Sequence, residues 1–179
     1  MSTPANILKQ YWGYSQFRPP QDKVIDAVLN KQDVLTILPT GGGKSICFQV
    51  PAMMLEGICL VITPLIALMQ DQVKQLKQRG IAAVAVHAGM HHREIDITLD
   101  NCIYGQQKFL YLSPERLQTE LFKERVKKMK VCLVAIDEAH CISQWGYDFR
   151  PPYLQIAELR DVLPNIPFIA LTASATKQV

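Results

Sequence analysis

Leu38-Pro39-Thr40-Gly41-Gly42-Gly43-Lys44-Ser45 is the stretch of sequence that decides the fold. It ends the apolar run Val34–Leu38 and leads into a segment with helical character, so it joins a predicted strand to a predicted helix. Three consecutive glycines let the backbone turn tightly and direct its N–H groups inward at a polyphosphate. The N-terminus of the following helix adds positive potential at the same place. The stretch therefore predicts a phosphate-binding loop.

Two residues at the end of this loop carry functional groups suited to a nucleotide. Lys44 can reach the β- and γ-phosphates of ATP, and the hydroxyl of Ser45 can ligate Mg²⁺. The strict pattern G-x-x-x-x-G-K-[ST] fails at its first position, which is Leu38. A glycine-rich turn with an incidental lysine is the alternative, and the flanking strand and helix favour phosphate binding over it.

Six short apolar runs recur along the chain, and several are apolar at nearly every position. Strands buried on both faces have this composition, as in a parallel sheet covered by helices. The segments between them read as helices, including 20–30 and 64–79, the latter with Thr63 as its cap, Pro64 in its first turn and Gly80 at its exit. We therefore predict an α/β fold with a mostly parallel central sheet flanked by helices, and ligands bound where the strands end. The runs are Val34–Leu38, Ile58–Ile62, Ile81–Val86, Phe109–Leu112, Val131–Ile136 and Phe168–Leu171.

The composition indicates one folded, soluble domain spanning 1–179, with 49% hydrophobic and 20% charged residues. The net charge of +3 permits nucleic-acid binding without indicating it. The sequence shows no signal segment and no apolar stretch of membrane-spanning length, so we expect a cytoplasmic protein with no membrane partner. Cys59 and Cys132 lie within apolar runs, which favours buried free thiols over disulfides or zinc ligands.

A pair of adjacent carboxylates follows the fifth apolar run directly, in Asp137-Glu138-Ala139-His140. A strand end would hold Asp137 where it can orient a Mg²⁺ shell beside the γ-phosphate, and Glu138 could act as the base for the attacking water. His140 could couple this site to whatever binds above it. A capping pair at a helix start is the alternative. Together with the glycine-rich loop, the pair favours an ATP site that uses ATP and Mg²⁺.

Three stretches together resemble motifs I, II and III of superfamily II helicases, and specifically of the RecQ family: LPTGGGKS (38–45), IDEAHCISQWGYDFRP (136–151) and ALTASAT (170–176). The similarity runs from about Leu8 to Thr176. It implies the first RecA-like domain, a three-layer P-loop NTPase fold, of an ATP-dependent DNA helicase that moves 3′ to 5′ and acts in recombination and repair. A bacterial member would be associated with the nucleoid.

The segment YSQFRPPQ (14–21) is similar to motif 0 of the same family. By that match Gln21 reads the adenine edge, Tyr14 stacks near the base and Arg18 supports the nucleotide, with 1–30 as the adenine-recognition segment. A side-chain amide offers both a donor and an acceptor, which suits adenine. Without the match, Tyr14 and Phe17 would be read as core aromatics.

Two segments at strand ends resemble the DNA-contacting motifs Ia and Ib. In the first, the hydroxyl of Thr63 and the chain at Pro64 could hold a DNA phosphate at a helix N-terminus. In the second, Ser113–Arg116, the side chain of Arg116 is either a phosphate contact or part of an internal salt bridge. Ordinary helix capping remains an equal alternative for both segments.

The stretch 143–150 carries three aromatic residues beside a glycine and an arginine. Trp145, Tyr147 and Arg150 are candidates for DNA contact, because aromatic rings stack on unpaired bases; for Phe149 we favour a buried hydrophobic contact. Tyr147 stands where many relatives have a histidine, and Ser174 of the third motif stands where a threonine is commoner. The small hydroxyl residues of that motif can bond toward Asp137 and Glu138. The basic run Lys123, Arg125, Lys127, Lys128 and Lys130 reads as a solvated helix face rather than a DNA patch.

Hydrolysis in this class needs a second RecA-like domain that supplies an arginine finger, and the sequence shows no such domain. The chain alone is therefore expected to bind Mg-ATP but to hydrolyse it slowly and to unwind nothing. Two alternatives stay open: a nucleotide-dependent binding module that never catalyses, and an RNA helicase of the DEAH or DEAD type. Against the second stands Cys141–Arg150, which such enzymes are not expected to carry at this place.

Overall fold

In the computed structural model, which describes residues 3–143 and 148–174, six strands form one sheet in the order β1-β6-β5-β2-β4-β3. All five pairings are parallel, so each connection crosses over the sheet and most carry a helix. The predicted α/β fold is confirmed, and the sheet is parallel throughout. The strands are β1 (Val34–Ile37), β2 (Ile58–Ile62), β3 (Ala83–Val86), β4 (Phe109–Leu112), β5 (Val131–Ile136) and β6 (Phe168–Thr172).

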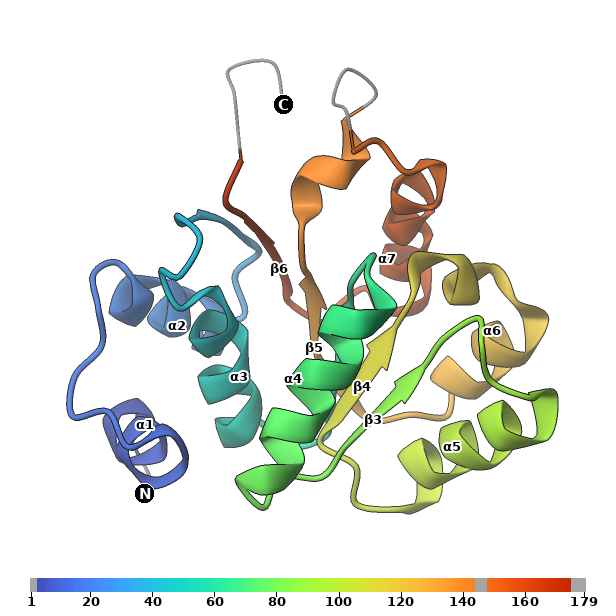
Figure 1. The fold of residues 1–179 in the computed structure, drawn as a ribbon, viewed down its shortest axis with the longest axis horizontal. Helices are drawn as coiled ribbons and strands as arrows, with labels where there is room; N and C mark the ends of the chain where they lie inside the picture. Colours follow the sequence, from blue (N-terminus) through green and yellow to red (C-terminus); the bar gives the residue numbers. More distant parts are fainter. Residues whose placement is uncertain (1–2, 144–147, 175–179) are drawn as a thin grey trace.

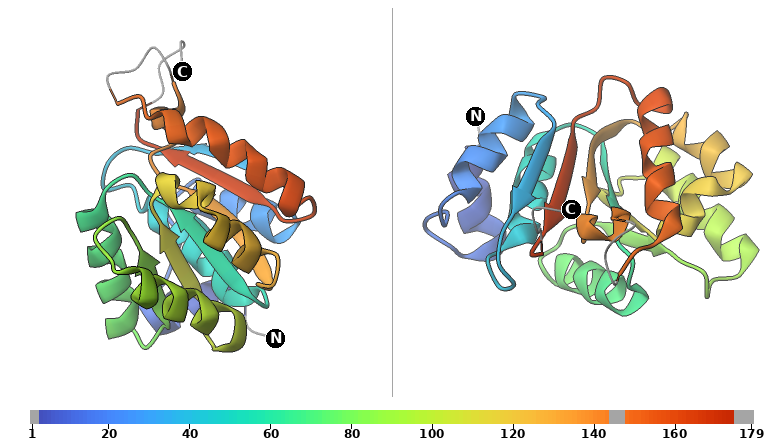
Figure 2. Two further views of the ribbon diagram at one scale, coloured as in Figure 1. Left: turned by 90° about the vertical axis from the view of Figure 1, so that its right-hand side faces the viewer. Right: turned by 90° about the horizontal axis from the view of Figure 1, so that it is seen from above.

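Helices cover the sheet on both faces (Figure 1; Figure 2). One apolar cluster joins α2, α3 and α4 to one face, and a second joins α5, α6, α7 and η3 to the other. The helix α1 packs outside this arrangement, against α2 and α3. The helices are α1 (Pro4–Trp12), α2 (Gln21–Leu29), α3 (Lys44–Met54), α4 (Ile66–Gln78), α5 (His92–Tyr104), α6 (Glu120–Val126) and α7 (Leu159–Val162), with 3₁₀ turns η1 (Pro114–Gln118), η2 (Ala139–Ile142) and η3 (Pro151–Glu158).

Burial of the strands follows their position in the sheet. Every residue of β2 and β4 is buried, as the continuous apolar runs predict. Each such side chain contributes about 1.5–3 kcal/mol relative to an exposed one. The expectation is wrong for β1, where Leu35 is 67% and Ile37 is 54% exposed. The strand β1 pairs with β6 at the end of the sheet order, and its outward side chains meet no helix in the described residues.

The start of α4 differs from the prediction. The helix begins at Ile66, after Leu65 in an extended conformation, and no side chain caps it. Thr63 instead continues the strand ladder, because its N–H donates to the carbonyl of Leu112, and neither Thr63 nor Pro64 belongs to the helix. The exit is as predicted: Gly80 has a φ of 74°, a left-handed conformation that glycine adopts without a steric cost.

Other sequence expectations concern cysteines and membranes. All five cysteines are free and buried, which confirms the prediction of buried thiols. Burial raises the pKa of Cys47 to about 12.

Within residues 3–143 and 148–174, no helix combines the length and the apolar character needed to cross a bilayer.

Candidate active site

The glycine-rich loop follows β1 and ends where α3 begins at Lys44, so the predicted strand–loop–helix context is present. Gly41 and Gly43 have φ values of 77° and 74°, a region that disfavours residues with a Cβ. A Cβ on Gly42 would lie 2.8 Å from the carbonyl oxygen of Pro39. The loop therefore needs its glycines for both conformation and space.

Lys44 and the two carboxylates come together although they are far apart in the chain. The ammonium of Lys44 lies 3.6 Å from a carboxylate oxygen of Glu138, with the two side chains 16% and 26% exposed. Asp137, at the end of β5, is only 5% exposed. The convergence arises because β1 and β5 are parallel strands that flank β6, so their carboxyl ends share one edge of the sheet.

The pKa of Asp137 is raised, first by burial and second by the neighbouring charge of Glu138. Three groups oppose this rise. The N–H of Glu138 donates to Asp137 Oδ1 at 3.0 Å, Lys44 contributes its positive charge, and the polar side chain of Gln72 adds a smaller effect that lowers the pKa. The aspartate is thus a buried acid held by a small set of defined partners.

The turn after β5 has an unusual backbone. Glu138 adopts φ 51° and ψ 47°, the left-handed region, which few residues other than glycine enter. His140, in the following turn η2, contacts Glu138 at 3.3 Å and Asp148 at 3.6 Å. Its Nδ1 also lies 2.9 Å from the hydroxyl oxygen of Thr172, at the end of β6. His140 therefore connects the acidic pair to the third motif.

Among the residues of the third motif that the structure describes, no hydroxyl contacts the carboxylates directly. Thr172 bonds to His140, and the N–H of Ser174 donates to the Thr172 hydroxyl at 3.1 Å. The expected bond from these small residues toward Asp137 and Glu138 is thus relayed by His140 rather than made directly.

The segment similar to motif 0 packs onto the glycine-rich loop. The amide of Gln21 donates to the carbonyls of Gly42 and Gly43 at 3.3 and 3.2 Å, while its oxygen accepts from the N–H of Arg18 at 2.9 Å. The guanidinium of Arg18 donates to the carbonyl of Gly41 at 3.5 Å. Both ends of the Gln21 amide are therefore engaged by the protein itself.

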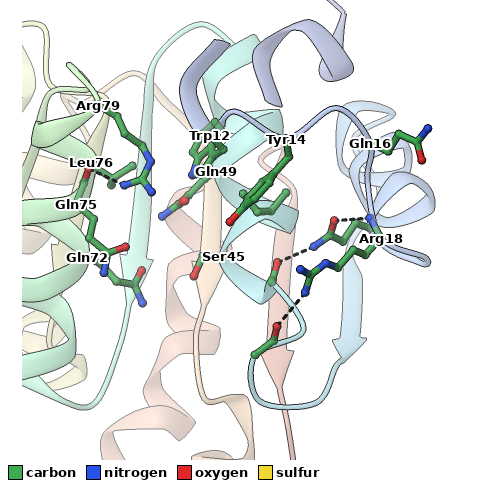
Figure 3. Close-up of a pocket in the computed structure, with 14 residues that line it drawn as sticks. Trp12, Tyr14, Gln16, Arg18, Ser45, Gln49, Gln72, Gln75, Leu76 and Arg79 are labelled. Carbon is green, nitrogen blue, oxygen red and sulfur yellow. Dashed lines mark hydrogen bonds between the residues drawn. The ribbon is translucent and has the colours of Figure 1, made fainter. Parts of the chain in front are cut away.

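A cavity of about 370 Å³ opens beside this segment (Figure 3). Tyr14, which is 55% exposed, and Ser45 line it, so Tyr14 is not a core aromatic. The opposite wall comes from α4, with Gln72, Gln75 and Arg79, which the sequence analysis did not single out. One signal was available. Gln72 sits between Met69, Val73 and Leu76 on the buried face of the helix, where an apolar residue is expected.

The segments proposed for DNA contact show their side chains turned inward. Thr63 is fully buried and Ser113 is 5% exposed, and neither hydroxyl has a hydrogen-bond partner among the described residues. Arg116 donates to the carbonyl of His87 at 3.1 Å and forms no salt bridge with the described residues; its contact with a DNA phosphate stays a prediction. Arg150 donates to the carbonyl of Pro64 at 3.2 Å and so connects the stretch 143–150 to the segment at 63–64.

Two further residues of that group, Trp145 and Tyr147, lie outside the described residues. Phe149, expected to be buried, is half-buried. Only Lys123 and Arg125 of the basic run lie in α6, which ends at Val126, so the run does not form the single helix face expected. Three of its members pair with acidic side chains: Lys123 with Glu120, Arg125 with Asp96 and Asp100, and Lys130 with Glu56.

Comparison with known proteins agrees with this geometry. The model of the DEAD/DEAH box helicase family matches residues 18–179. The ATP-dependent DNA helicase RecQ of Haemophilus influenzae is 47% identical over 173 residues, which cover 97% of this chain and 28% of that protein. The RecQ of Bacillus subtilis is 48% identical over 176 residues, covering 97% of this chain and 30% of the relative.

A solved structure shares the fold at low sequence identity. The crystal structure of the DUF1998 helicase MrfA bound to DNA and AMPPNP superposes with a TM-score of 0.78 at 16% identity. The match covers 99% of this chain and 27% of that one. The chain thus spans less than a third of the length of these relatives.

Proposed function

Since the chain belongs to the DEAD/DEAH box helicase family, we propose that it is the ATP-binding motor domain of a RecQ-type DNA helicase. In this role it is the first of two RecA-like domains and couples ATP hydrolysis to 3′–5′ unwinding of DNA in recombination and repair. The observation that carries the proposal is the meeting of Lys44 with Asp137 and Glu138 beside the glycine-rich loop. The identity of 47–48% to RecQ helicases supports the choice among helicase types.

The loop binds the phosphates of ATP through residues 40–45. Backbone N–H groups and the N-terminus of α3 face the anion, and Lys44 supplies the positive charge. In the structure Lys44 pairs with Glu138. Phosphate oxygens compete for the same ammonium group, so ATP binding draws Lys44 away from Glu138 and leaves that carboxylate available to the attacking water.

Mg²⁺ fits the residues that are present. The hydroxyl of Ser45 lines the cavity and Asp137 offers a carboxylate, and both are the hard oxygen donors that this ion prefers. No group of three His, Cys, Asp or Glu side chains suited to a metal occurs in the described part of the chain. Mg²⁺ in nucleotide sites commonly takes only one or two protein oxygens beside phosphate and water. When bound, the ion would neutralise charge that develops on the phosphates.

Hydrolysis is assigned to Glu138 as the base and to His140 as its support. Glu138 can accept the proton of the water that attacks the γ-phosphate. His140 contacts Glu138, Thr172 and Asp148 at once, so it is placed to respond when DNA binds the stretch 143–150. Tyr14, Arg18 and Gln21 would hold the base; for Gln21 this requires its amide to exchange a loop carbonyl for adenine.

The DNA track is proposed at 63–64, Arg116, Trp145, Tyr147 and Arg150. The link from Arg150 to the carbonyl of Pro64 joins two parts of this track and supports their acting together. The buried hydroxyl of Thr63 is not accessible to a phosphate in this conformation, so its contact requires a local rearrangement. Similarly, Arg116 must leave the carbonyl of His87.

Turnover by the whole protein tests the proposal. ATP hydrolysis measured with single-stranded DNA or RNA of equal sequence should be stimulated by the DNA, and a 3′-tailed duplex should be unwound. Stronger stimulation by RNA would favour an RNA helicase instead. Residues 1–179 tested by themselves should bind Mg-ATP and turn it over at least ~10³-fold more slowly than the whole protein, because the proposed reaction uses an arginine finger from a second RecA-like domain. Rapid DNA-stimulated turnover by this chain alone would contradict the requirement for a second RecA-like domain.

A further inference from the structure

The cavity between the motif 0 segment and α4 carries positive charge on both of its walls. Arg18 belongs to the wall formed by the motif 0 segment, and Arg79, directly after α4, belongs to the opposite wall (Figure 3). None of the described residues that line the cavity is acidic. Two guanidinium groups without a carboxylate favour a ligand that is anionic or that offers the face of an aromatic ring.

The protein uses only a small part of the Arg79 side chain. Its Nη1 donates to the carbonyl of Gln75, one turn earlier, at 2.9 Å, a contact that basic residues commonly make at a helix end. Within residues 3–143 and 148–174, Arg79 has no acidic partner and no aromatic ring lies under its guanidinium. A guanidinium has several N–H groups and flat faces, so most of its binding capacity remains available to a ligand.

The position of the cavity indicates which part of a nucleotide reaches Arg79. Gly41, Gly43 and Ser45 line the same cavity, so it begins at the phosphate-binding loop. When phosphates occupy that loop, the sugar and base can extend into the hollow between Tyr14 and Arg79. The volume of about 370 Å³ lies within the range of roughly 300–1,000 Å³ that is usual for small-molecule sites. We therefore expect the base, rather than the phosphates, to meet the α4 wall.

Buried hydrogen bonds link α3 and α4, two helices that contribute to this cavity. Gln49 on α3 and Gln72 on α4 line the cavity and are 5% and 9% exposed. The amide of Gln49 donates to the hydroxyl of Tyr111 at 3.3 Å, and that hydroxyl donates to Gln72 Oε1 at 2.9 Å. This link fixes α4, and with it Arg79, relative to the helix that begins at the phosphate-binding loop.

We propose that Arg79 binds the base of ATP: its guanidinium stacks on one face of the base while the ring of Tyr14 covers the other. The inference rests on the function proposed above and adds a residue from the α4 wall to the base-binding group. Stacking by Arg79 supplies affinity that is independent of Gln21, whose amide is engaged at both ends by the protein. Such stacking needs a flat cation, so an arginine suits this position better than a lysine.

Binding of two probes tests this in the whole protein, because Mg-ATP carries a base and inorganic tripolyphosphate with Mg²⁺ does not. Arg79→Lys keeps the charge and can still donate to the carbonyl of Gln75, but it lacks the flat guanidinium. We expect Arg79→Lys and Arg79→Met to lower the affinity for ATP about five- to tenfold. The affinity for tripolyphosphate should stay within about twofold, since that probe offers no ring to stack on. Isothermal titration calorimetry gives both affinities.

Lys77→Met is the matched control. Lys77 is an exposed cation of α4 that lines a different hollow, so its removal changes the charge of the helix but not the proposed base contact. This variant should bind both probes as the unmodified protein does. Thermal melting of the three variants detects any loss of the fold. If Arg79→Met does not fold, Arg79→Lys decides the matter, because it keeps a cation that can bond to the helix end.

The outcomes separate the two proposals. If the unmodified protein does not bind Mg-ATP, the proposed function fails and the role of Arg79 fails with it. If it binds Mg-ATP and the Arg79 variants either bind ATP normally or lose ATP and tripolyphosphate alike, Arg79 does not hold the base, while the ATP site stands. Normal ATP binding by Arg79→Lys alone would show that charge matters rather than stacking, which also overturns the proposed contact. A loss confined to ATP in both Arg79 variants, without change in Lys77→Met, supports it.

Discussion

The ammonium of Lys44 and the carboxylate of Glu138 form an ion pair across the site, at 3.6 Å. Both side chains are less than a third exposed, so the pair is shielded from solvent more than a surface pair. One residue comes from the phosphate-binding loop and the other from the turn after β5. Their contact joins these two parts of the site directly.

Lys44→Ala removes the cation that the phosphates need. We expect ATP affinity to fall by about 2–3 kcal/mol, the scale of a hydrogen bond to a charged group, with the fold intact because Lys44 stands at a helix start rather than in the core. Titration of a fluorescent ATP analogue measures the affinity, and thermal melting followed by circular dichroism shows whether the fold is intact. Unchanged affinity would remove Lys44 from the phosphate site.

Glu138→Gln separates binding from turnover in the whole protein. The amide keeps the size of the side chain but cannot accept a proton from water, so ATP should bind while kcat falls about 10²–10⁴-fold. Losing the charge also removes the partner of Lys44, and ATP affinity should rise slightly rather than fall. Steady-state turnover and equilibrium binding on the same preparation give the two numbers. A variant with normal kcat would show that another group is the base.

Gly43→Ala should weaken ATP binding through geometry alone. The φ of Gly43 is 74°, and an added Cβ would lie 2.4 Å from the amide nitrogen of Gln21, so the contact between the loop and the motif 0 segment must break. Gly80→Ala is the matched control, because Gly80 has the same φ and open space around it. Both variants should lose roughly 1 kcal/mol of stability from the left-handed backbone. We expect reduced ATP affinity in Gly43→Ala alone, measured by titration.

Asp33 gives a prediction about pH and stability at the far end of the sheet. Its carboxylate accepts from Arg160 at 2.7 Å and from the N–H of Phe168 at 2.9 Å. Burial raises the pKa of Asp33, but the contacts with Phe168 and Arg160 together outweigh it, and the pKa in the folded state lies below its ordinary value. The stabilisation is therefore complete above the unfolded pKa and is lost as the pH falls through the folded one.

Asp33→Asn should accordingly lower the melting temperature at pH 7 by a few degrees, for at most about 1 kcal/mol, because the pair is largely exposed. The difference from the unmodified protein should shrink progressively below pH 4. A difference that stays constant down to pH 2.5 would show that the charge of Asp33 does not contribute.

The strand runs and the phosphate loop could be predicted from sequence because their signals are local. A glycine-rich turn between a strand and a helix, and an acidic pair after an apolar run, each specify a conformation within a few residues. The parallel sheet then brings their ends together, which is why Lys44 and Asp137 were expected to meet. The exposure of Leu35 and Ile37 could not be predicted in the same way, since an edge strand and a central strand have the same apolar composition.

Contacts between distant elements were beyond the sequence for a physical reason. Gln72 meets Tyr111 only because α4 packs against β4, and the pairing of His140 with Thr172 depends on β6 lying beside β5. Thr63 was expected to cap α4, but it continues the strand ladder and the helix begins two residues later than predicted. The local sequence is compatible with a helix cap, but the hydrogen bond of Thr63 to the neighbouring strand keeps it extended.

The left-handed backbone at Glu138 limits which amino acids can stand at this position. Along a continuing strand, consecutive side chains point to opposite faces, so neighbouring acids would serve different sides of the sheet. The reversal at Glu138 breaks that alternation and lets both acids serve one ligand. A valine or isoleucine here would resist the required torsion angles, whereas asparagine or glycine would accept them. In a set of variants at position 138, residues that tolerate a left-handed backbone should therefore give stable protein, whatever their side-chain chemistry.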